Sequence, residues 1–259
     1  MNDLCKIEFK ELKELYLGVN NISDIKVLEN AKLNKLEKLH LSENQISDIN
    51  ILEKVNFKEL KELNLSYNKI SDIKVLEKVK FDKLEILYLR NNQISDINIL
   101  EKVNFKELKR LNLFKNKISE IKVLENVKFD KLEILELSEN QILDINILEK
   151  VNFKELKELY LGNNIISDIK VLENVRFDKL DTLYLGDNQI SDINILEKVN
   201  IKELKELYLH NNKISYIKVL ETVKFDKLEI LDLGNNQISK KENNSIISKL
   251  KSKIKEFYI

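Results

Sequence analysis

Residues 84–94 read Leu84-Glu85-Ile86-Leu87-Tyr88-Leu89-Arg90-Asn91-Asn92-Gln93-Ile94. The same phrase of leucines, an asparagine and an isoleucine recurs at a constant spacing of 24 residues. Its first leucine stands at positions 12, 36, 60, 84, 108, 132, 156, 180, 204 and 228. Self-similarity at a fixed period of about 20–50 residues is typical of repeat architectures, so the spacing predicts one continuous array of stacked coils.

Each phrase alternates residues that face inward with residues that face outward. In residues 15–17, Tyr16 stands between two leucines, which is the period-two pattern of a strand with one buried face. Equivalent strands of successive coils must run side by side in the same direction, so a parallel sheet is expected. Farther along the repeat, Ile25, Leu28 and Ala31 follow at spacing three, which predicts a short helical turn. We therefore expect strands along one side of the array and short helices along the other.

The repeat resembles those of the leucine-rich repeat family over nearly the whole chain. The phrase Asn44-Gln45-Ile46-Ser47-Asp48-Ile49 is similar to the subclass that contains bacterial internalins and protein-phosphatase regulatory subunits. Repeats of that subclass usually have about 22 residues, so this unit is slightly longer on its helical side. Helices, about 10 Å wide, also need more room than strands, about 4.8 Å apart, so the array should bend around its strands. The resemblance implies an α/β fold, a right-handed horseshoe-shaped solenoid with a parallel sheet on the concave face and short helices on the convex face.

The two ends of the chain depart from the repeat. Residues 1–11 carry apolar side chains in the phase of a convex half-repeat, which predicts an N-terminal cap. Ten repeats fill residues 12–239. Residues 240–259 predict an amphipathic helical cap that shields the last coil, with an apolar face made of Ile246, Ile247, Leu250, Ile254 and Phe257. The alternative for this segment is a helix that binds a membrane or a partner.

The charge balance bears on the class of partner. The chain has 44 basic and 44 acidic residues and a formal net charge of zero, with both signs scattered along it. Nonspecific binding to nucleic acid or to an anionic membrane needs a strong positive field, so neither partner is expected. No apolar run of about 18 residues is present, and Met1–Lys10 has charges where a signal peptide needs an apolar stretch. Membrane insertion and classical export are therefore not expected.

Cysteine usage and the histidine positions bear on location and chemistry. Cys5 is the only cysteine, so no intrachain disulfide can form, and a reducing, cytoplasmic setting is predicted. His40 and His210 lie seven repeats apart, about 34 Å at ~4.8 Å per strand, which is too far for one reaction centre. The sequence has no cysteine–histidine cluster for zinc and no phosphate-binding glycine loop. We predict a chain that is not an enzyme and that binds no cofactor or metal.

Two recurring residue types are interpreted as parts of the fold. An asparagine side chain can satisfy backbone donors and acceptors that turns leave without ladder partners. The asparagines concerned stand at positions 20, 44, 68, 92, 116, 140, 164, 188, 212 and 236. The recurring phenylalanines are expected to fill the core, with Ile201 replacing one of them, and stand at positions 57, 81, 105, 129, 153, 177 and 225.

Comparison of repeat with repeat separates a constant side from a variable one. One convex position is glutamate throughout, at residues 29, 53, 77, 101, 125, 149, 173, 197 and 221. The outward position of the strand varies widely instead, as at Tyr16, His40, Asn64, Tyr88 and Glu136. Drift after duplication would have scattered both exposed positions alike, so we infer that the concave face has been diversified to contact a partner.

The expected contact surface centres on Tyr160, Tyr184 and Tyr208, which should lie on three adjacent strands. Gly162 and Gly186 beside them are expected to leave the rings uncovered. Acidic and polar residues frame the rings, which favours a partner surface with apolar and basic residues. The alternative is that cross-strand tyrosine stacking only stabilises the sheet. The predicted contact residues are Tyr88, Arg90, Phe114, Glu136, Tyr160, Thr182, Tyr184, Asp187, Glu206, Tyr208, His210 and Asp232.

These observations predict a noncatalytic scaffold whose concave sheet binds a protein or peptide. Two alternatives remain open at this point. The chain could be a structural, self-assembling repeat element, or the regulatory subunit of an enzyme supplied by another chain. We expect a monomer, with homo-assembly as the open alternative.

Overall fold

The computed structural model describes residues 9–259, which divide into two compact units. The first unit runs to Ile118 and includes residues 126–132, and the second contains residues 119–125 and 133–259. Most of the predicted N-terminal cap, with Cys5, lies outside the described residues.

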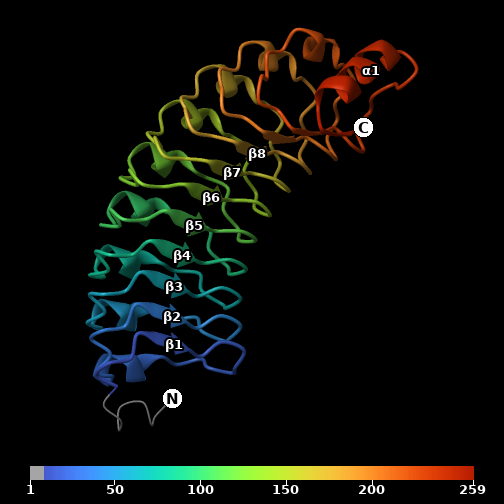
Figure 1. Cartoon of the computed structure of the whole chain (residues 1–259). Coiled ribbons are helices and arrows are strands. Elements are labelled where there is room, and N and C mark those ends of the chain that lie inside the picture. The colour runs from blue at the N-terminus through green and yellow to red at the C-terminus, as the bar shows by residue number, and fades with distance from the viewer. Residues whose placement is uncertain (1–8) are drawn as a thin grey trace. The chain divides into compact units, whose positions relative to one another are not determined.

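The first unit is built from strands and short 3-10 helices that alternate along the chain (Figure 1). Its parallel strands pair in sequence order, and each residue pairs with the residue 24 positions later, as Leu15 does with Leu39. The strands are β1 (Glu14–Tyr16), β2 (Lys38–His40), β3 (Glu62–Asn64), β4 (Ile86–Tyr88) and β5 (Arg110–Asn112). The 3-10 helices are η1 (Lys26–Asn30), η2 (Asn50–Glu53), η3 (Lys74–Glu77) and η4 (Asn98–Glu101).

The second unit repeats this order and ends on an α-helix and one further strand (Figure 1). Its strands are β6 (Ile134–Glu136), β7 (Glu158–Tyr160), β8 (Thr182–Tyr184), β9 (Glu206–Tyr208), β10 (Ile230–Asp232) and β11 (Glu256–Tyr258). Its helices are η5 (Lys122–Glu125), η6 (Asn146–Glu149), η7 (Lys170–Glu173), η8 (Asn194–Glu197), η9 (Lys218–Glu221) and α1 (Asn244–Lys253). In both units strands pack on strands and 3-10 helices on 3-10 helices, which confirms the predicted leucine-rich-repeat solenoid. No helix of the described chain has the length and apolar character needed to cross a bilayer.

The core of each coil is the set of residues that the repeat predicts. From the second coil onward the inward-facing leucines of the strand, such as Leu39 and Leu41, are almost fully buried. The recurring phenylalanines at positions 57, 81, 105, 129, 153 and 177 are buried as well. Phe57 and Phe81 stack with ring centroids 6.4 Å apart. Phe225 differs from this prediction because it is only half-buried, since the last coil has α1 rather than another repeat beside it.

The asparagine ladder connects each coil to its neighbour. Asn116 donates from Nδ2 to the carbonyl oxygens of Leu89, Leu113 and Phe114, at 3.0, 3.0 and 3.3 Å. Its Oδ1 accepts from the backbone N–H of Ile94 at 3.0 Å. One side chain thus satisfies four backbone groups on two coils, and the predicted structural role is confirmed.

The C-terminal segment differs from the predicted single helical face. Ile246, Ile247 and Leu250 are buried on α1, but the backbone of Ile254 is already extended, with φ −104° and ψ 132°. Phe257 therefore lies in β11, where it pairs with Leu231 of β10. A parallel strand here satisfies backbone groups at the edge of β10 that a longer helix would leave open.

Each repeat bends sharply at one residue just after its strand. These residues have φ between 49° and 56°, and none is glycine. They are Val19, Glu43, Tyr67, Asn91, Lys115, Glu139, Asn163, Asp187, Asn211 and Asn235. The left-handed conformation costs a residue with a β-carbon about 1–2 kcal/mol, so the stacked coils must hold it in place. Backbone hydrogen bonds to the next coil do so, such as that from Asn163 N to Gly186 O at 2.9 Å.

Candidate functional site

Three tyrosines form a ladder on the strand face of the second unit. Tyr160, Tyr184 and Tyr208 are the last residues of β7, β8 and β9, and the strand register places them directly opposite one another. Their ring centroids lie 6.2 Å and 5.2 Å apart along the ladder. Each ring is half-buried, so a partner can reach one side of it. The structure thus brings together the tyrosines that the sequence singled out.

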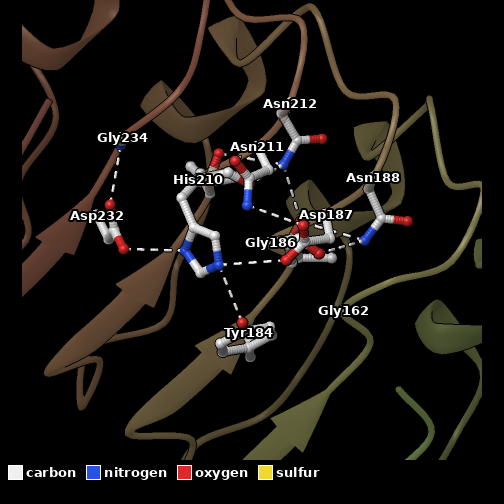
Figure 2. Close-up of polar contacts among 12 residues, drawn as sticks. Gly162, Tyr184, Gly186, Asp187, Asn188, His210, Asn211, Asn212, Asp232 and Gly234 are labelled. Atoms are coloured by element: carbon white, nitrogen blue, oxygen red, sulfur yellow. Dashed lines mark hydrogen bonds and ion pairs between the residues drawn. The ribbon is translucent and has the colours of Figure 1, made fainter. Parts of the chain in front are cut away.

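His210 extends the ladder and connects it to carboxylates (Figure 2). Its ring meets that of Tyr184 edge-on at 5.3 Å, and Nε2 shares a hydrogen bond of 3.0 Å with the Tyr184 hydroxyl. Nε2 also lies 3.4 Å from Oδ2 of Asp187, and Nδ1 lies 2.9 Å from Oδ2 of Asp232. The Nδ1 contact has an ion-pair distance, but its angle is not that of a hydrogen bond. Three residues thus hold the imidazole in one orientation.

The glycines beside the ladder do not leave the rings uncovered, so that prediction is wrong. A β-carbon on Gly162 would collide with the Tyr184 ring, and one on Gly186 would lie 2.6 Å from Nε2 of His210. The ring of Tyr184 packs directly against Gly162, and the ring of His210 packs against Gly186 (Figure 2). The rings therefore lean toward the preceding coil instead of standing free on the sheet.

The outer tyrosines are anchored through their hydroxyl groups. Tyr160 donates to Glu158 at 2.8 Å and Tyr208 donates to Glu206 at 3.0 Å. Burial, with the hydrogen bond to Glu206, raises the pKa of the Tyr208 phenol to about 12. The same two causes raise the pKa of Tyr160. For Tyr184, burial and then the negative charge of Asp187 raise the pKa.

An alkaline titration should detect these anchored tyrosines. Because their folded-state pKa is raised, each stays protonated above about pH 10, where an unfolded tyrosine ionises. The stability that they contribute is complete below about pH 10 and is lost as the pH rises toward about 12. We expect Tyr208→Phe to remove a component of the tyrosinate absorbance whose midpoint lies near pH 12.

The same titration in guanidinium chloride is the control, because there all eight tyrosines should ionise together near about pH 10. If the component removed by Tyr208→Phe in the folded protein also had its midpoint near about pH 10, the anchoring would be contradicted.

The charged groups around the tyrosine ladder are mostly carboxylates. The outward residues of β6 to β11 and the residues that follow them include no lysine or arginine in this part of the described chain. The carboxylates that frame the ladder are Glu136, Glu158, Asp187, Glu206, Asp232 and Glu256. A chain with zero net charge therefore presents an acidic aromatic surface, and such a surface attracts basic groups.

Thr182 was predicted to contact a partner, and the structure contradicts this. Its side chain is buried, because it lies between the longer side chains of Glu158 and Glu206 on the flanking strands. Glu136 is half-buried, and its carboxylate accepts from the backbone N–H of Ser138 at 2.8 Å.

The first unit holds the remaining predicted contact residues. The guanidinium carbon of Arg90 lies 4.5 Å from the ring centroid of Phe114 and 5.2 Å from that of Tyr67. Tyr88, at the end of β4, is half-buried opposite Asn64 and Asn112. The sequence also singles out Tyr67 as a possible member of this cluster, because mostly polar residues fill the same position in the other repeats.

Another cluster that the prediction missed lies at the N-terminal end of the first unit. The Tyr16 ring meets that of His40 edge-on at 4.6 Å, and Nε2 of His40 lies 3.0 Å from Glu62. Tyr16 is 56% exposed. The signal for this cluster was a tyrosine and a histidine at the same strand position of adjacent repeats.

Other kinds of site find less support. Residues 9–259 contain no group of three or more histidine, cysteine or acidic side chains placed to hold a metal ion. On the helix side, a hollow of about 390 Å³ is lined by residues such as Asp24, Lys26 and Glu29, and similar hollows recur in later repeats. Because they recur with the repeat, these hollows are products of coil stacking and not a specific site.

Comparison with known proteins identifies the family. A family model described as leucine-rich repeats in two copies matches residues 10–54, 34–78, 58–102, 82–126, 130–174, 178–222 and 202–252. The chain belongs to the leucine-rich repeat family. A search of the curated proteins finds no significant relative.

Solved structures share this repeat fold. An internalin C2 from Listeria monocytogenes is 26% identical, with a TM-score of 0.54 over 87% of this chain and 80% of that chain. A leucine-rich repeat protein from Leptospira interrogans is 24% identical, with a TM-score of 0.61 over 97% of this chain and 73% of that one. A chain from the octameric complex of latrophilin 3, Unc5D and the leucine-rich repeats of FLRT2 is 24% identical, with a TM-score of 0.70 over 96% and 74%.

Proposed function

We propose that this leucine-rich repeat chain is a noncatalytic module that binds a protein or peptide through its strand face. The ladder of Tyr160, Tyr184, Tyr208 and His210 is its main contact surface, and a basic, partly apolar segment is the partner chemistry. The observation that carries the proposal is the presence of aromatic rings held in place and of several carboxylates on one face. Family membership supports it, because proteins of this family generally serve as protein- or peptide-binding scaffolds.

The ladder has the physical properties of a binding surface. Tyrosine offers a large contact area with few rotatable bonds and is enriched where interfaces are energetically important. Here the hydroxyl groups are already anchored by Glu158, His210 and Glu206, so little side-chain entropy remains to be lost on binding. The surrounding carboxylates can pair with lysine or arginine of the partner and speed its approach.

Two structural neighbours have been solved in complex with other molecules. FLRT2 is in complex with latrophilin 3 and Unc5D. The plant peptide hormone receptor RGFR1 is in complex with RGF2, and the present chain spans 36% of that receptor chain. These neighbours are 24% identical to this chain, and they support a protein or peptide as the class of partner.

Selection from a random-peptide display library tests the proposal. We expect the wild-type chain to enrich peptides that combine lysine or arginine with apolar residues. For a selected peptide, replacing both Tyr184 and Tyr208 by alanine should weaken binding more than about tenfold, because both are central interface aromatics. Isothermal titration calorimetry measures the loss.

Tyr216→Ala is the matched control, because Tyr216 is also exposed but follows the strand and lies off the ladder. It should leave affinity unchanged. If the ladder tyrosines only stabilise the sheet, the double variant would lower the melting temperature and keep the affinity of the folded fraction. That outcome, or a library without basic enrichment, would refute the proposed surface.

The cytoplasmic location stays a prediction from the single cysteine.

A further inference from the structure

Arg90 of the first unit is held between aromatic rings of two neighbouring coils. Tyr67 comes from the preceding repeat and Phe114 from the following one, and their ring centroids lie 5.2 Å and 4.5 Å from the guanidinium carbon. Rings at these distances attract a cation through their electron-rich faces. The flanking rings therefore restrict a side chain that is otherwise long and flexible.

The N–H groups of the Arg90 guanidinium donate no hydrogen bond to other residues of the described chain. Lysines elsewhere pair with a carboxylate of a neighbouring coil, as Lys61 does with Glu37 at 2.7 Å and Lys109 with Glu85 at 2.7 Å. Among residues 9–259, the Arg90 guanidinium makes no hydrogen bond or ion pair, and its contacts are the two rings. An arginine has five N–H donors, so a positioned fork of donors remains exposed to solvent.

The local charge also favours an anion. The outward residues of β4 and β5 include Arg110 and no aspartate or glutamate. This part of the strand face is therefore basic, in contrast to the acidic face around the tyrosine ladder. An approaching carboxylate meets no like charge among these outward residues.

We propose that Arg90 is a binding point for a carboxylate side chain, aspartate or glutamate, of the bound protein or peptide. The inference rests on the proposed function, because it assumes that the strand face binds such a partner. A planar guanidinium matches a carboxylate with two parallel hydrogen bonds, which a lysine cannot do. Tyr67 and Phe114 are positioning residues, since they hold the fork and leave its N–H groups available.

The same random-peptide library gives the test. Peptides selected on the wild-type chain should be enriched in aspartate or glutamate, and selection on Arg90→Gln should lose this enrichment. Arg176→Gln, which removes an exposed arginine from the helix side, is the matched control and should keep it. Melting curves of all variants establish that each is folded.

A double-mutant cycle on one selected peptide tests the contact itself. Replacing the peptide's enriched glutamate by glutamine should weaken wild-type binding by about tenfold, as expected for a hydrogen-bonded charge pair. The same peptide change should have no further effect on Arg90→Gln. Arg90→Lys keeps the charge but loses the planar fork, so its affinity should fall by several-fold.

The outcomes separate this inference from the proposed function. Acidic enrichment that survives Arg90→Gln, or additive losses in the cycle, would overturn the role of Arg90 even if basic enrichment and the effect of the tyrosine ladder persist. Loss of basic enrichment with acidic enrichment retained would refute the ladder as the main contact surface and leave Arg90 supported. Binding by Arg90→Lys equal to wild type would overturn the two-bond geometry.

Discussion

Phe81→Ala is expected to lower the free energy of unfolding by about 3–5 kcal/mol. The side chain is 1% exposed and stacks on Phe57 of the preceding coil, so its removal leaves a cavity between coils that cannot close without moving both. Because each repeat is stabilised by its neighbours, the loss should be concentrated in the first unit. Denaturant titration followed by circular dichroism measures it, and hydrogen exchange locates it.

Phe81→Ile is the matched control, since the chain itself has isoleucine at the same repeat position, Ile201, where it is 4% exposed. Its cost should be clearly smaller than that of the alanine variant, because most of the volume is kept. A further comparison is Phe225→Ala at the half-buried end of the column, where less apolar area is lost. Equal losses for Phe81→Ile and Phe81→Ala would contradict the cavity argument.

Asn116→Ala should cost about 1–3 kcal/mol, the penalty for leaving buried polar groups without partners. The change removes three donated bonds and one accepted bond, and the backbone groups left behind belong to Leu89, Leu113, Phe114 and Ile94. Water cannot easily replace the amide, because Asn116 is buried between coils. The melting temperature and the free energy of unfolding give the magnitude.

Asn98→Ala controls for the loss of an amide as such. Asn98 begins η4 and is exposed. Its backbone N–H donates to the carboxylate of Asp96 at 2.9 Å, and this bond does not involve the Asn98 side chain. Its replacement should change stability by less than about 0.5 kcal/mol, as is usual for a surface substitution. If Asn116→Ala melted at the same temperature as the wild type, the asparagine ladder would not stabilise the fold.

The fold was predictable because one pattern decides it and occurs ten times. Leucine spacing predicts the strand, the spacing of three predicts the helical turn, and repetition predicts how coils stack. The asparagines and phenylalanines could be assigned to the interior because a solenoid has few other places for a recurring large or polar side chain. Each of these inferences depends on periodicity, which a single sequence displays fully.

The end of the chain was harder to predict because the period stops there. Ile246, Ile247, Leu250 and Ile254 have helical spacing, and Phe257 continues it well enough to suggest one longer helix. The open edge of β10 decides the structure instead by pairing with residues 256–258. Such a tertiary preference outweighs local spacing, and it is not visible in residues 240–259 alone.

The candidate site was predictable in its members and less so in its geometry. Variation among repeats identified Tyr160, Tyr184 and Tyr208, because it shows which positions of the repeat are free to change. It did not show that Thr182 is covered by its neighbours, or that the guanidinium of Arg90 lies between two aromatic rings. Those facts depend on the direction in which a side chain points across the coils. The position of a residue in the repeat does not reveal that direction.

The seating of each ring on the glycine of the coil before it links positions that are 22 or 24 residues apart. A bulky residue at position 162 would force the Tyr184 ring aside, and one at 186 would displace the His210 imidazole from Tyr184 and Asp232. Anyone who randomises this surface to obtain new specificities should therefore vary such positions as coupled pairs. If they were varied independently, many members of the variant library would have a side chain that clashes with the aromatic ring of the next coil.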